Sequence, residues 1–377
     1  MRVVMTGQIG MDKKHYLEAV EQLAGERGAP IEMFNVGDMM YAEAPDVRKG
    51  RILDLPLSRL HTLRRAAFKD IISETRPVDE HPNILINTHA TFRWRHGLFS
   101  AYDFDQMKQA SPNMLICLMD NIEVVHHRMH KEHDIDATLK DCMVWREEEI
   151  LATELLAQAL GCHNEFYILS RGRHKETIET CVRLVTRPDL KRVYPSFPMT
   201  HVVGMPDVLA EIEEFRRRLA EHFICFDPAD VDEKLLLDRA LEARESKEEW
   251  LDVTPHQFGG RSDGEPIRVS VQEVLDIAGD IDGQIYMRDF KLIDQSDMIV
   301  SLIPELPGGG PGLSSGVERE LHHAWEHTKE VYVVWKPKRS PSPFITETAT
   351  QIFASVDEAL EYFAAKGMFP EVNLFGH

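Results

Sequence analysis

The sequence predicts an α/β protein with two doubly wound parallel-sheet domains. Short apolar runs of strand length alternate with helical segments along the chain, which is the pattern of parallel βαβ units. The alternation is interrupted at residues 186–192, where a proline and several charges fall together, and then restarts. A chain of 377 residues is long enough for two domains of ordinary size. We therefore expect one domain over residues 1–188 and a second over 191–377.

The first domain is expected to alternate strands and helices from its first residues. Its apolar runs predict strands at residues 2–6, 31–36, 83–90, 114–120 and 166–170. The segments between them predict helices that close near Gly28, over 52–74, over 145–161 and over 177–185. Gly161 is a typical helix stop, because glycine adopts the left-handed conformation that ends many helices.

The second domain repeats the same alternation. Its predicted strands are residues 193–197, 223–227, 298–304, 331–335 and 351–355. Its predicted helices are residues 206–222, 285–296, 316–328 and 356–367. An acidic stretch at 228–265 is expected to be helical in part and otherwise a loop or lid.

Composition and charge exclude several classes of function. The formal net charge of −20 opposes nonspecific binding of DNA or RNA, whose phosphates it would repel, but it leaves a small phosphorylated ligand possible. No segment approaches the roughly 18 consecutive apolar residues of a membrane span. The N-terminus runs straight into a strand-like segment without the apolar region of a signal peptide, so we expect a cytoplasmic protein.

No metal centre or disulfide framework is expected. The five cysteines are scattered without a C-x-x-C pair, and they are interpreted as buried apolar residues. The histidines of residues 126–133 lie on a polar helix without a carboxylate at ligand spacing, and they are interpreted as solvated surface. The basic run 171–175 is interpreted as a solvated loop that could help to hold an anion.

A first candidate site follows the first strand. Gly7, Gly10 and Lys13 have the order of a phosphate-binding loop, in which backbone N–H groups face phosphate and a lysine reaches the outer phosphates. Asp12 stands where a second glycine is expected, and Lys14 stands where a hydroxyl would bind Mg²⁺. The alternative is an ordinary strand–turn–helix in which the glycines only make the turn.

The segments 81–103 and 111–129 resemble the middle of archaeal-type adenylate kinases, and 145–159 with 166–170 resemble their closing helix and strand. The resemblance covers about residues 1–185 and implies a P-loop-kinase-like domain that binds ATP and Mg²⁺. It implies that the loop residues face a nucleotide's phosphates and that nearby arginines neutralise charge; the candidates are Arg93, Arg128 and Arg146. Because of the two departures in the loop, we favour binding over phosphoryl transfer.

A second candidate site lies where a glycine-rich loop meets a helix, at residues 305–328. Serine hydroxyls and free N–H groups at a helix start suit a phosphate or sugar hydroxyls. At about 100° per residue, Glu320 lies roughly 70° from the centre of the helix's apolar stripe and Glu318 roughly 90° away on the other flank, so Glu320 borders the core more closely. A carboxylate there could attack an electron-poor sugar carbon while a second acid, such as Asp289, assists the leaving base.

Residues 288–335 resemble the nucleoside 2-deoxyribosyltransferase family and its nucleoside 5′-monophosphate N-glycosidase branch, through Asp289, Ser296-Asp297 and the Gly316–Ala324 helix. The resemblance covers about 191–377 and implies a flavodoxin- or Rossmann-like domain with Glu320 as nucleophile. It also implies a set of residues that contact the substrate: Asp289, Tyr194, Ser196, Ser314, Ser315 and Gly316. No cofactor is implied for the glycosidic chemistry, and a homo-oligomer is expected. The alternative is an interaction module in which Glu320 only caps the helix.

The main hypothesis is a nucleoside- or nucleotide-processing enzyme that cleaves or exchanges the base–sugar bond through Glu320, with a nucleotide bound by the first domain. One alternative is an ATP-dependent nucleoside monophosphate kinase that depends on Lys13. The other is a nucleotide sensor or scaffold without turnover. In all three the partner is a small nucleoside or nucleotide, not a nucleic acid or a membrane.

Overall fold

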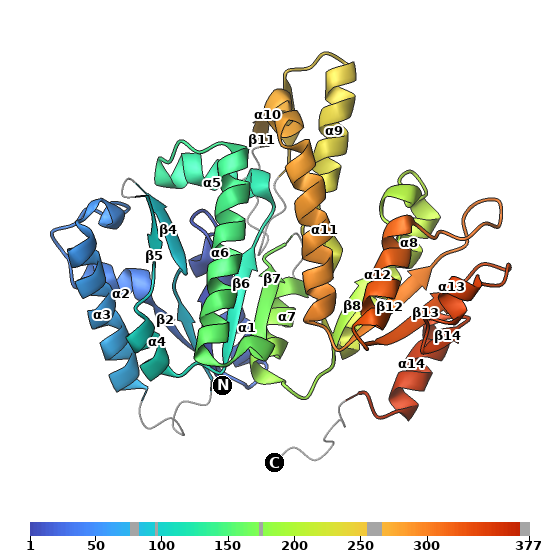
Figure 1. Ribbon diagram of the computed structural model, residues 1–377, viewed down its shortest axis with the longest axis horizontal. Coiled ribbons are helices and arrows are strands. Elements are labelled where there is room, and N and C mark those ends of the chain that lie inside the picture. Colours follow the sequence, from blue (N-terminus) through green and yellow to red (C-terminus); the bar gives the residue numbers. More distant parts are fainter. Residues whose placement is uncertain (76–82, 95–96, 173–175, 255–265, 370–377) are drawn as a thin grey trace. The chain divides into compact units, whose positions relative to one another are not determined.

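The computed structural model describes residues 1–75, 83–94, 97–172, 176–254 and 266–369, and its ribbon is shown in Figure 1. The chain divides into two compact units. Unit 1 combines Met1–Thr186 with Asp230–Gly283, and unit 2 combines Arg187–Ala229 with Gln284–His377.

Unit 1 is built on a five-stranded parallel sheet in the order β2-β3-β1-β6-β7. Its strands are β1 (Arg2–Thr6), β2 (Glu32–Asn35), β3 (Ile84–Asn87), β6 (Met114–Met119) and β7 (Phe166–Ser170). Most of their residues are buried, as expected when helices cover both faces of a parallel sheet. A two-stranded antiparallel ribbon, β4 (Thr91–Trp94) with β5 (Gly97–Ser100), follows β3.

The helices of unit 1 begin and end where local signals place them. They are α1 (Lys13–Glu26), α2 (Val36–Ala42), α3 (Leu57–Glu74), α4 (Phe104–Ala110), α5 (Ile122–His133), α6 (Leu139–Leu160) and α7 (Glu176–Thr186). A capping box of Thr138 and Asp141 starts α6 six residues before the predicted position, and Gly161 ends it with a φ of 78°. Apolar side chains of α2, α3, α4 and α6 pack with β1, β3 and β6 in one buried cluster.

The acidic stretch predicted as part of the second domain belongs mostly to unit 1. The segment Asp230–Gly283 forms α9 (Glu233–Glu245), the antiparallel pair β10 (Trp250–Val253) and β11 (Ile267–Ser270), and α10 (Val271–Asp276). Two contacts with α6 explain why the boundary near residue 188 does not separate the units. Glu233 forms an ion pair with Arg146 of α6, and the Glu273 carboxylate accepts from the Leu139 backbone N–H at 2.7 Å.

Unit 2 is built on a second five-stranded parallel sheet in the order β14-β13-β12-β8-β9. Its strands are β8 (Arg192–Ser196), β9 (Ile224–Cys225), β12 (Met298–Ile303), β13 (Glu330–Trp335) and β14 (Gln351–Phe353). Its helices are α8 (Pro206–His222), α12 (Ser315–Glu326), α13 (Pro343–Thr346), α14 (Val356–Ala365) and the end of α11 (Ala278–Asp294). Side chains of α8 and α14 pack with the sheet in one buried cluster.

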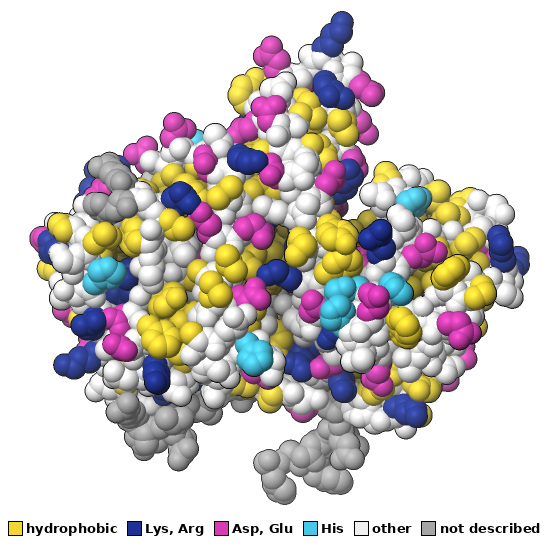
Figure 2. Space-filling view, in the orientation of Figure 1, with side chains coloured by type: hydrophobic (Ala, Val, Ile, Leu, Met, Phe, Trp, Pro, Cys, Tyr) yellow, Lys and Arg dark blue, Asp and Glu magenta, His cyan; other side chains and the backbone are white. Residues whose placement is uncertain are grey.

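The α/β class with two parallel sheets is therefore confirmed, and the deoxyribosyltransferase-like assignment of the second sheet stays a prediction. Within the described ranges, every helix is too short or too polar to cross a membrane. On the face shown in Figure 2, acidic and basic side chains are interspersed, so the net charge of −20 is not gathered in one patch of that face.

Candidate functional site

The phosphate-loop candidate lies at the carboxyl end of β1, the central strand of the unit 1 sheet. Two of its residues must be glycine for steric reasons. Gly7 has a φ of +147°, and a Cβ there would lie 2.8 Å from the Leu118 carbonyl oxygen. Gly10 has a φ of +83°, and a Cβ there would lie 2.9 Å from the Val125 carbonyl oxygen. The loop is therefore wrapped closely against β6 and α5, which fixes the direction of its backbone.

Lys13, the first residue of α1, is buried at the base of this loop. Its Nζ donates to the Gly7 carbonyl oxygen at 2.5 Å and lies 3.2 and 3.3 Å from the two ring nitrogens of His89. Burial lowers the pKa of Lys13 to about 8, although the Glu149 carboxylate opposes the shift. Burial, reinforced by the Lys13 charge, holds the pKa of His89 well below its ordinary value. At neutral pH this leaves a charged lysine beside a neutral imidazole.

Glu149 of α6 ties the loop to the segment that follows β3. Its buried carboxylate accepts from the backbone N–H groups of Gly7 at 3.0 Å, Ala90 at 2.8 Å and Thr91 at 2.8 Å. It also accepts from the Thr91 hydroxyl at 2.7 Å. These hydrogen bonds occupy both carboxylate oxygens, so Glu149 positions the loop. The sequence analysis missed it, because it lies inside a helix-forming run of glutamates.

Asp12, the first departure from the phosphate-loop pattern, is paired with an arginine. Asp12 occupies the N-cap position of α1 in the left-handed conformation, with φ 48° and ψ 47°, and its Oδ2 accepts from Arg171 Nη2 at 2.8 Å. Arg171 follows β7 and also lies 3.4 Å from Asp120, which pairs with Arg128 at 3.0 Å. The Asp12 charge is thus neutralised within the protein. The rest of the predicted basic loop, 173–175, lies outside the described residues.

Lys14, the second departure, points to the surface. Its Nζ forms an ion pair with Asp38 at 2.9 Å, and this hydrogen bond raises the pKa of Lys14. Two amide oxygens near the loop, Gln8 Oε1 and Asn87 Oδ1, are buried without a hydrogen-bond partner among the described residues. They are hard oxygen donors of a kind that Mg²⁺ accepts. The described loop nevertheless offers no hydroxyl in the position of Lys14, so its donor set is incomplete for the metal.

The three predicted arginines are placed differently. Arg128 lies at the loop, with Nη1 donating to the Gly10 and Met11 carbonyl oxygens at 3.4 and 3.5 Å. Arg93 of β4 pairs with Glu148. Arg146 is buried against Glu233, with N–O distances of 2.5 and 3.2 Å. A phosphate role for Arg93 or Arg146 stays a prediction, and it would require these pairs to open.

The structure adds a buried cation that the sequence analysis did not select. Arg64 of α3 is 1% exposed, and its Nη1 lies 3.4 Å from both His61 Nδ1 and the Ser100 carbonyl oxygen. Its Nη2 has no hydrogen-bond partner among the described residues. Burial lowers the pKa of Arg64 to about 10. A buried guanidinium with a free nitrogen suits an anionic group, and the available signal was an arginine on the apolar face of a helix.

Comparisons with known proteins concern the N-terminal half of the chain. A family model described as an AAA domain matches residues 6–142. The adenylate kinase of Pyrococcus furiosus is 26% identical over 195 residues, which are 50% of this chain and 95% of the relative. That of Pyrococcus horikoshii is 28% identical over the same shares. The N-terminal half is a P-loop kinase-like domain.

Two solved structures of kinases are also similar. A gluconokinase from Sinorhizobium meliloti 1021 matches with 13% identity and a TM-score of 0.30, over 49% of this chain and 89% of that chain. A shikimate kinase from Bacteroides thetaiotaomicron matches with 13% identity and a TM-score of 0.32, over 48% and 94%. The kinase-like assignment rests on the sequence comparisons.

The second candidate site lies in unit 2, at the carboxyl ends of β8 and β12. Glu320 of α12 turns toward β8, and its Oε2 accepts from the Ser196 hydroxyl at 2.6 Å. Ser301 is the register partner of Ser196 and donates to its Oγ at 3.4 Å. Glu318 is exposed, so the carboxylate nearer the core is Glu320, as the helical spacing indicated.

Several predicted residues gather around Glu320. Burial and, to a smaller extent, the negative charge of Asp289 raise the pKa of Glu320 to about 7, against the opposing hydrogen bonds of Ser196 and Tyr194. Burial also raises the pKa of Tyr194 well above its ordinary value, with contributions from the same two carboxylates. Asp289 lies 3.6 Å from the Arg288 guanidinium. The arrangement is a pair of interacting carboxylates with two hydroxyls, on two helices and a strand.

The three residues at the start of α12 act locally in the structure. The Ser314 side chain caps the helix by accepting from the Val317 N–H at 3.2 Å. Ser315 and Gly316 form the exposed first turn of the helix. The glycine-rich loop before them is closed by its own hydrogen bonds, Leu306 N–H to Gly310 O and Gly312 N–H to Pro304 O, both 2.8 Å. Substrate contacts of this turn stay a prediction.

Proposed function

We propose that the N-terminal P-loop domain transfers the terminal phosphoryl group of a nucleoside triphosphate to a nucleoside monophosphate. The observation that carries the proposal is the charge arrangement of the loop: Lys13 is buried and positive, His89 beside it is neutral, and Asp12 is already paired with Arg171. The aspartate therefore brings no unbalanced negative charge to the loop, and this favours the kinase alternative over a vestigial loop. The adenylate kinases among its relatives suggest AMP as the first acceptor to test.

The proposed roles follow from the contacts of each group. The loop N–H groups and the Lys13 ammonium, released from the Gly7 carbonyl, hold the donor's outer phosphates and stabilise charge as the phosphoryl group moves. Arg64, with its free Nη2, holds the acceptor's phosphate. The acceptor's phosphate oxygen forms the new P–O bond as the bond to the departing diphosphate breaks.

The direct test is incubation of the full chain with ATP, Mg²⁺ and a panel of nucleoside monophosphates, with separation of the products by anion-exchange chromatography. We expect ADP and a new diphosphate to form in equal amounts, and Lys13→Met to abolish both. Lys14→Met is the matched control, because Lys14 is exposed and pairs with Asp38 at the surface. Nucleotide binding by wild type without product over long incubation contradicts the kinase proposal and favours a sensor or scaffold.

A second candidate function belongs to unit 2, and the raised pKa of Glu320 favours it. A glutamate with a pKa of about 7, hydrogen-bonded to a serine and facing Asp289, has the character of a catalytic carboxylate. We propose that the ionised Glu320 attacks the anomeric carbon of a nucleoside or nucleotide, while the base leaves with the electrons of the C–N bond and takes up a proton from water. Water or a second base then takes the sugar from Glu320.

This second function is tested by release of free base from ribo- and deoxynucleosides and their 5′-phosphates, followed by liquid chromatography. Glu320→Gln is expected to abolish release while Glu318→Gln, two residues away and exposed, leaves it unchanged. Absence of base release by wild type, or equal release by both variants, contradicts it without bearing on the kinase test.

A further inference from the structure

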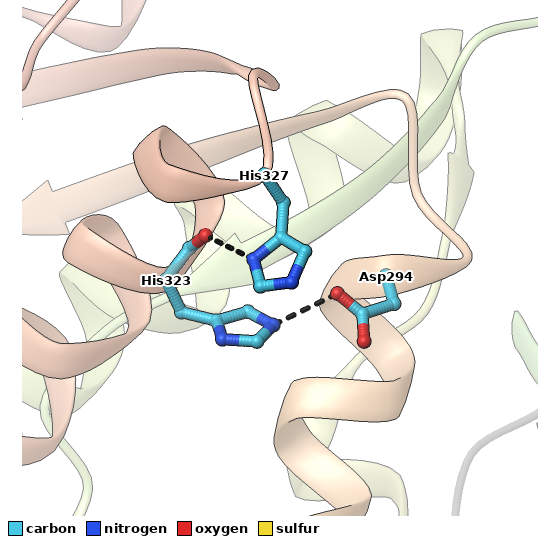
Figure 3. A group of neighbouring side chains, drawn as sticks. All are labelled: Asp294, His323 and His327. Atoms are coloured by element: carbon cyan, nitrogen blue, oxygen red, sulfur yellow. Dashed lines mark hydrogen bonds and ion pairs between the residues drawn. The ribbon is translucent and has the colours of Figure 1, made fainter.

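We propose that Asp294, His323 and His327 form a binding site for a divalent transition-metal ion of the zinc class. One ligand atom from each residue can be chosen so that all three lie within 4.8 Å of one another. Figure 3 shows the three side chains converging from two helix ends. All three belong to unit 2, and among the residues that the structure describes they are the one group of three that meets this distance.

The backbone at this place favours a cation. Asp294 is the last residue of α11, and His323 with its C-cap neighbour His327 lies in the last turn of α12. Both helices therefore direct the negative end of their dipole toward the three side chains, which stabilises positive charge. The two histidines are four residues apart, so their rings project from the same face of the helix.

The hydrogen bonding of His327 prepares one of its nitrogens for a metal. His327 Nδ1 lies 2.9 Å from the His323 carbonyl oxygen. A carbonyl oxygen only accepts, so Nδ1 must carry the proton, and in the neutral ring Nε2 then has a free lone pair. A backbone carbonyl that holds one ring nitrogen while the other faces the metal is the usual support of a histidine ligand.

The other two ligands are already close to each other. His323 Nε2 lies 2.8 Å from Asp294 Oδ1, and the His323 ring is stacked on Phe290 with a centroid distance of 4.3 Å and an angle of 12°. Ligand atoms around a tetrahedral ion with bonds of about 2.0–2.1 Å are separated by roughly 3.3 Å, so only small side-chain rotations are needed. On binding, the ion replaces the proton that Asp294 and His323 share.

The ligand set selects the class of ion. Two imidazoles with one carboxylate suit Zn²⁺ and its neighbours, whereas Mg²⁺ and Ca²⁺ prefer oxygen ligands. Three protein ligands leave one position for water.

The rival interpretation is a surface ion pair of Asp294 with protonated His323. Lys329 weakens the cation site to some extent, since its Nζ donates to the Asp294 carbonyl oxygen at 2.8 Å.

A bound ion would join the two helices that carry the unit 2 carboxylates. Asp289 precedes Asp294 on α11, and Glu320 precedes His323 on α12. The proposal does not depend on glycosidic activity, because its test measures metal binding alone.

The test uses the full chain, stripped of metal with a chelator, in a calorimetric titration with ZnCl₂ and an absorption titration with Co²⁺. We expect one tight equivalent of Zn²⁺ and the visible bands of four-coordinate cobalt. Asp294→Asn keeps the shape of the side chain, and His327→Ala removes an exposed ring. Each should weaken binding by about tenfold or more, since even the loss of a hydrogen-bond partner of a metal ligand costs about 10–100-fold in affinity. Zinc should also raise the melting temperature of wild type more than that of these variants.

Two controls separate this site from other histidines. His322→Ala changes an exposed neighbour that pairs with Glu326, and His126→Ala changes a histidine of α5 whose Nε2 lies 3.1 Å from that of His130. Both should bind zinc as wild type does. The proposal is overturned if wild type binds no stoichiometric zinc, if Asp294→Asn and His327→Ala bind as tightly as wild type, or if His126→Ala is the variant that loses binding.

Discussion

Burial shifts the pKa values of Lys13 and Glu320 in opposite directions, and in each case it favours the neutral form. The pKa of the Lys13 ammonium is lowered to about 8, and the pKa of the Glu320 carboxyl is raised to about 7. In both cases the charged form costs free energy in the folded protein, because water is replaced by a less polar surrounding. A ligand of opposite charge, or a developing positive charge on a sugar, recovers that cost.

Replacement of Lys13 by methionine should therefore stabilise the free protein. Its folded pKa lies below the ordinary 10.5, so charged Lys13 opposes folding at pH 7, and this cost fades as pH rises from about 8 toward 10.5. The shift corresponds to at most about 3 kcal/mol, less the hydrogen bond lost at Gly7. Urea denaturation at pH 7 measures the change, with Lys14→Met as the exposed control. A large loss of stability in Lys13→Met contradicts the interpretation.

Glu320 makes a pH prediction that needs no substrate. Its pKa rises from the ordinary 4.5 to about 7 on folding, so the folded state retains a proton that the unfolded state loses between these values. Stability contributed by Glu320 is therefore full below about pH 4.5 and is lost as pH rises through about 7. The stability of wild type relative to Glu320→Gln should decrease over this window in urea titrations. If glycosidic activity is found, it should rise with pH through about 7, since the nucleophile must be ionised. If the difference in unfolding free energy between wild type and Glu320→Gln does not change with pH, the pKa of Glu320 is not raised by folding, and the prediction is contradicted.

Among the elements, the loop between β1 and α1 depends on close packing of its backbone. The carboxylate of Glu149 in α6 accepts hydrogen bonds from Gly7 and from the Ala90–Thr91 segment, and it thereby joins the loop to the segment that follows β3. The glycines permit this by letting the loop pass within contact distance of carbonyl groups on neighbouring elements.

Gly10→Ala should disrupt the loop, while Gly25→Ala should not. At Gly10 a Cβ would lie 2.9 Å from the Val125 carbonyl, and its φ of +83° is strained for alanine. At Gly25, inside α1, a Cβ would meet nothing within 4 Å, and alanine is favoured over glycine in a helix by about 0.5–1 kcal/mol. We expect Gly10→Ala to lower nucleotide affinity and stability together, and Gly25→Ala to raise stability slightly. Calorimetric ATP titrations and urea denaturation measure both effects. If the two variants have the same ATP affinity and the same stability, the loop tolerates a Cβ at position 10 and the prediction is contradicted.

For the whole molecule, the division of the chain into units is the main difference from the sequence analysis. The stretch Asp230–Gly283 interrupts unit 2 in sequence but packs as part of unit 1. Its Glu233 supplies the partner of a fully buried arginine, and the Asp232 N–H donates to Asn121 Oδ1 at 3.1 Å.

A fragment of residues 1–188 should therefore be much less stable than the intact chain. It retains Arg146 without Glu233, and a buried charge that loses its partner costs about 3–5 kcal/mol. Arg146→Met in the same fragment removes the charge that has lost its carboxylate partner and should recover part of the loss. Thermal unfolding followed by circular dichroism compares the fragments. A 1–188 fragment as stable as the chain would show that the Asp230–Gly283 stretch adds no stability.

The sequence by itself determined the αβ alternation, the buried strands and the place of the glycine loop after β1. These depend on apolar periodicity and glycine position, which are local. It also indicated Glu320 over Glu318, since helical spacing is local as well. Only the tertiary structure decided that Asp12 is neutralised by Arg171, that Glu149 holds the loop, and that Asp294 meets the histidines of α12. These contacts join residues from 29 to 159 positions apart, and no short-range pattern records which distant side chains the packed sheets and helices bring together.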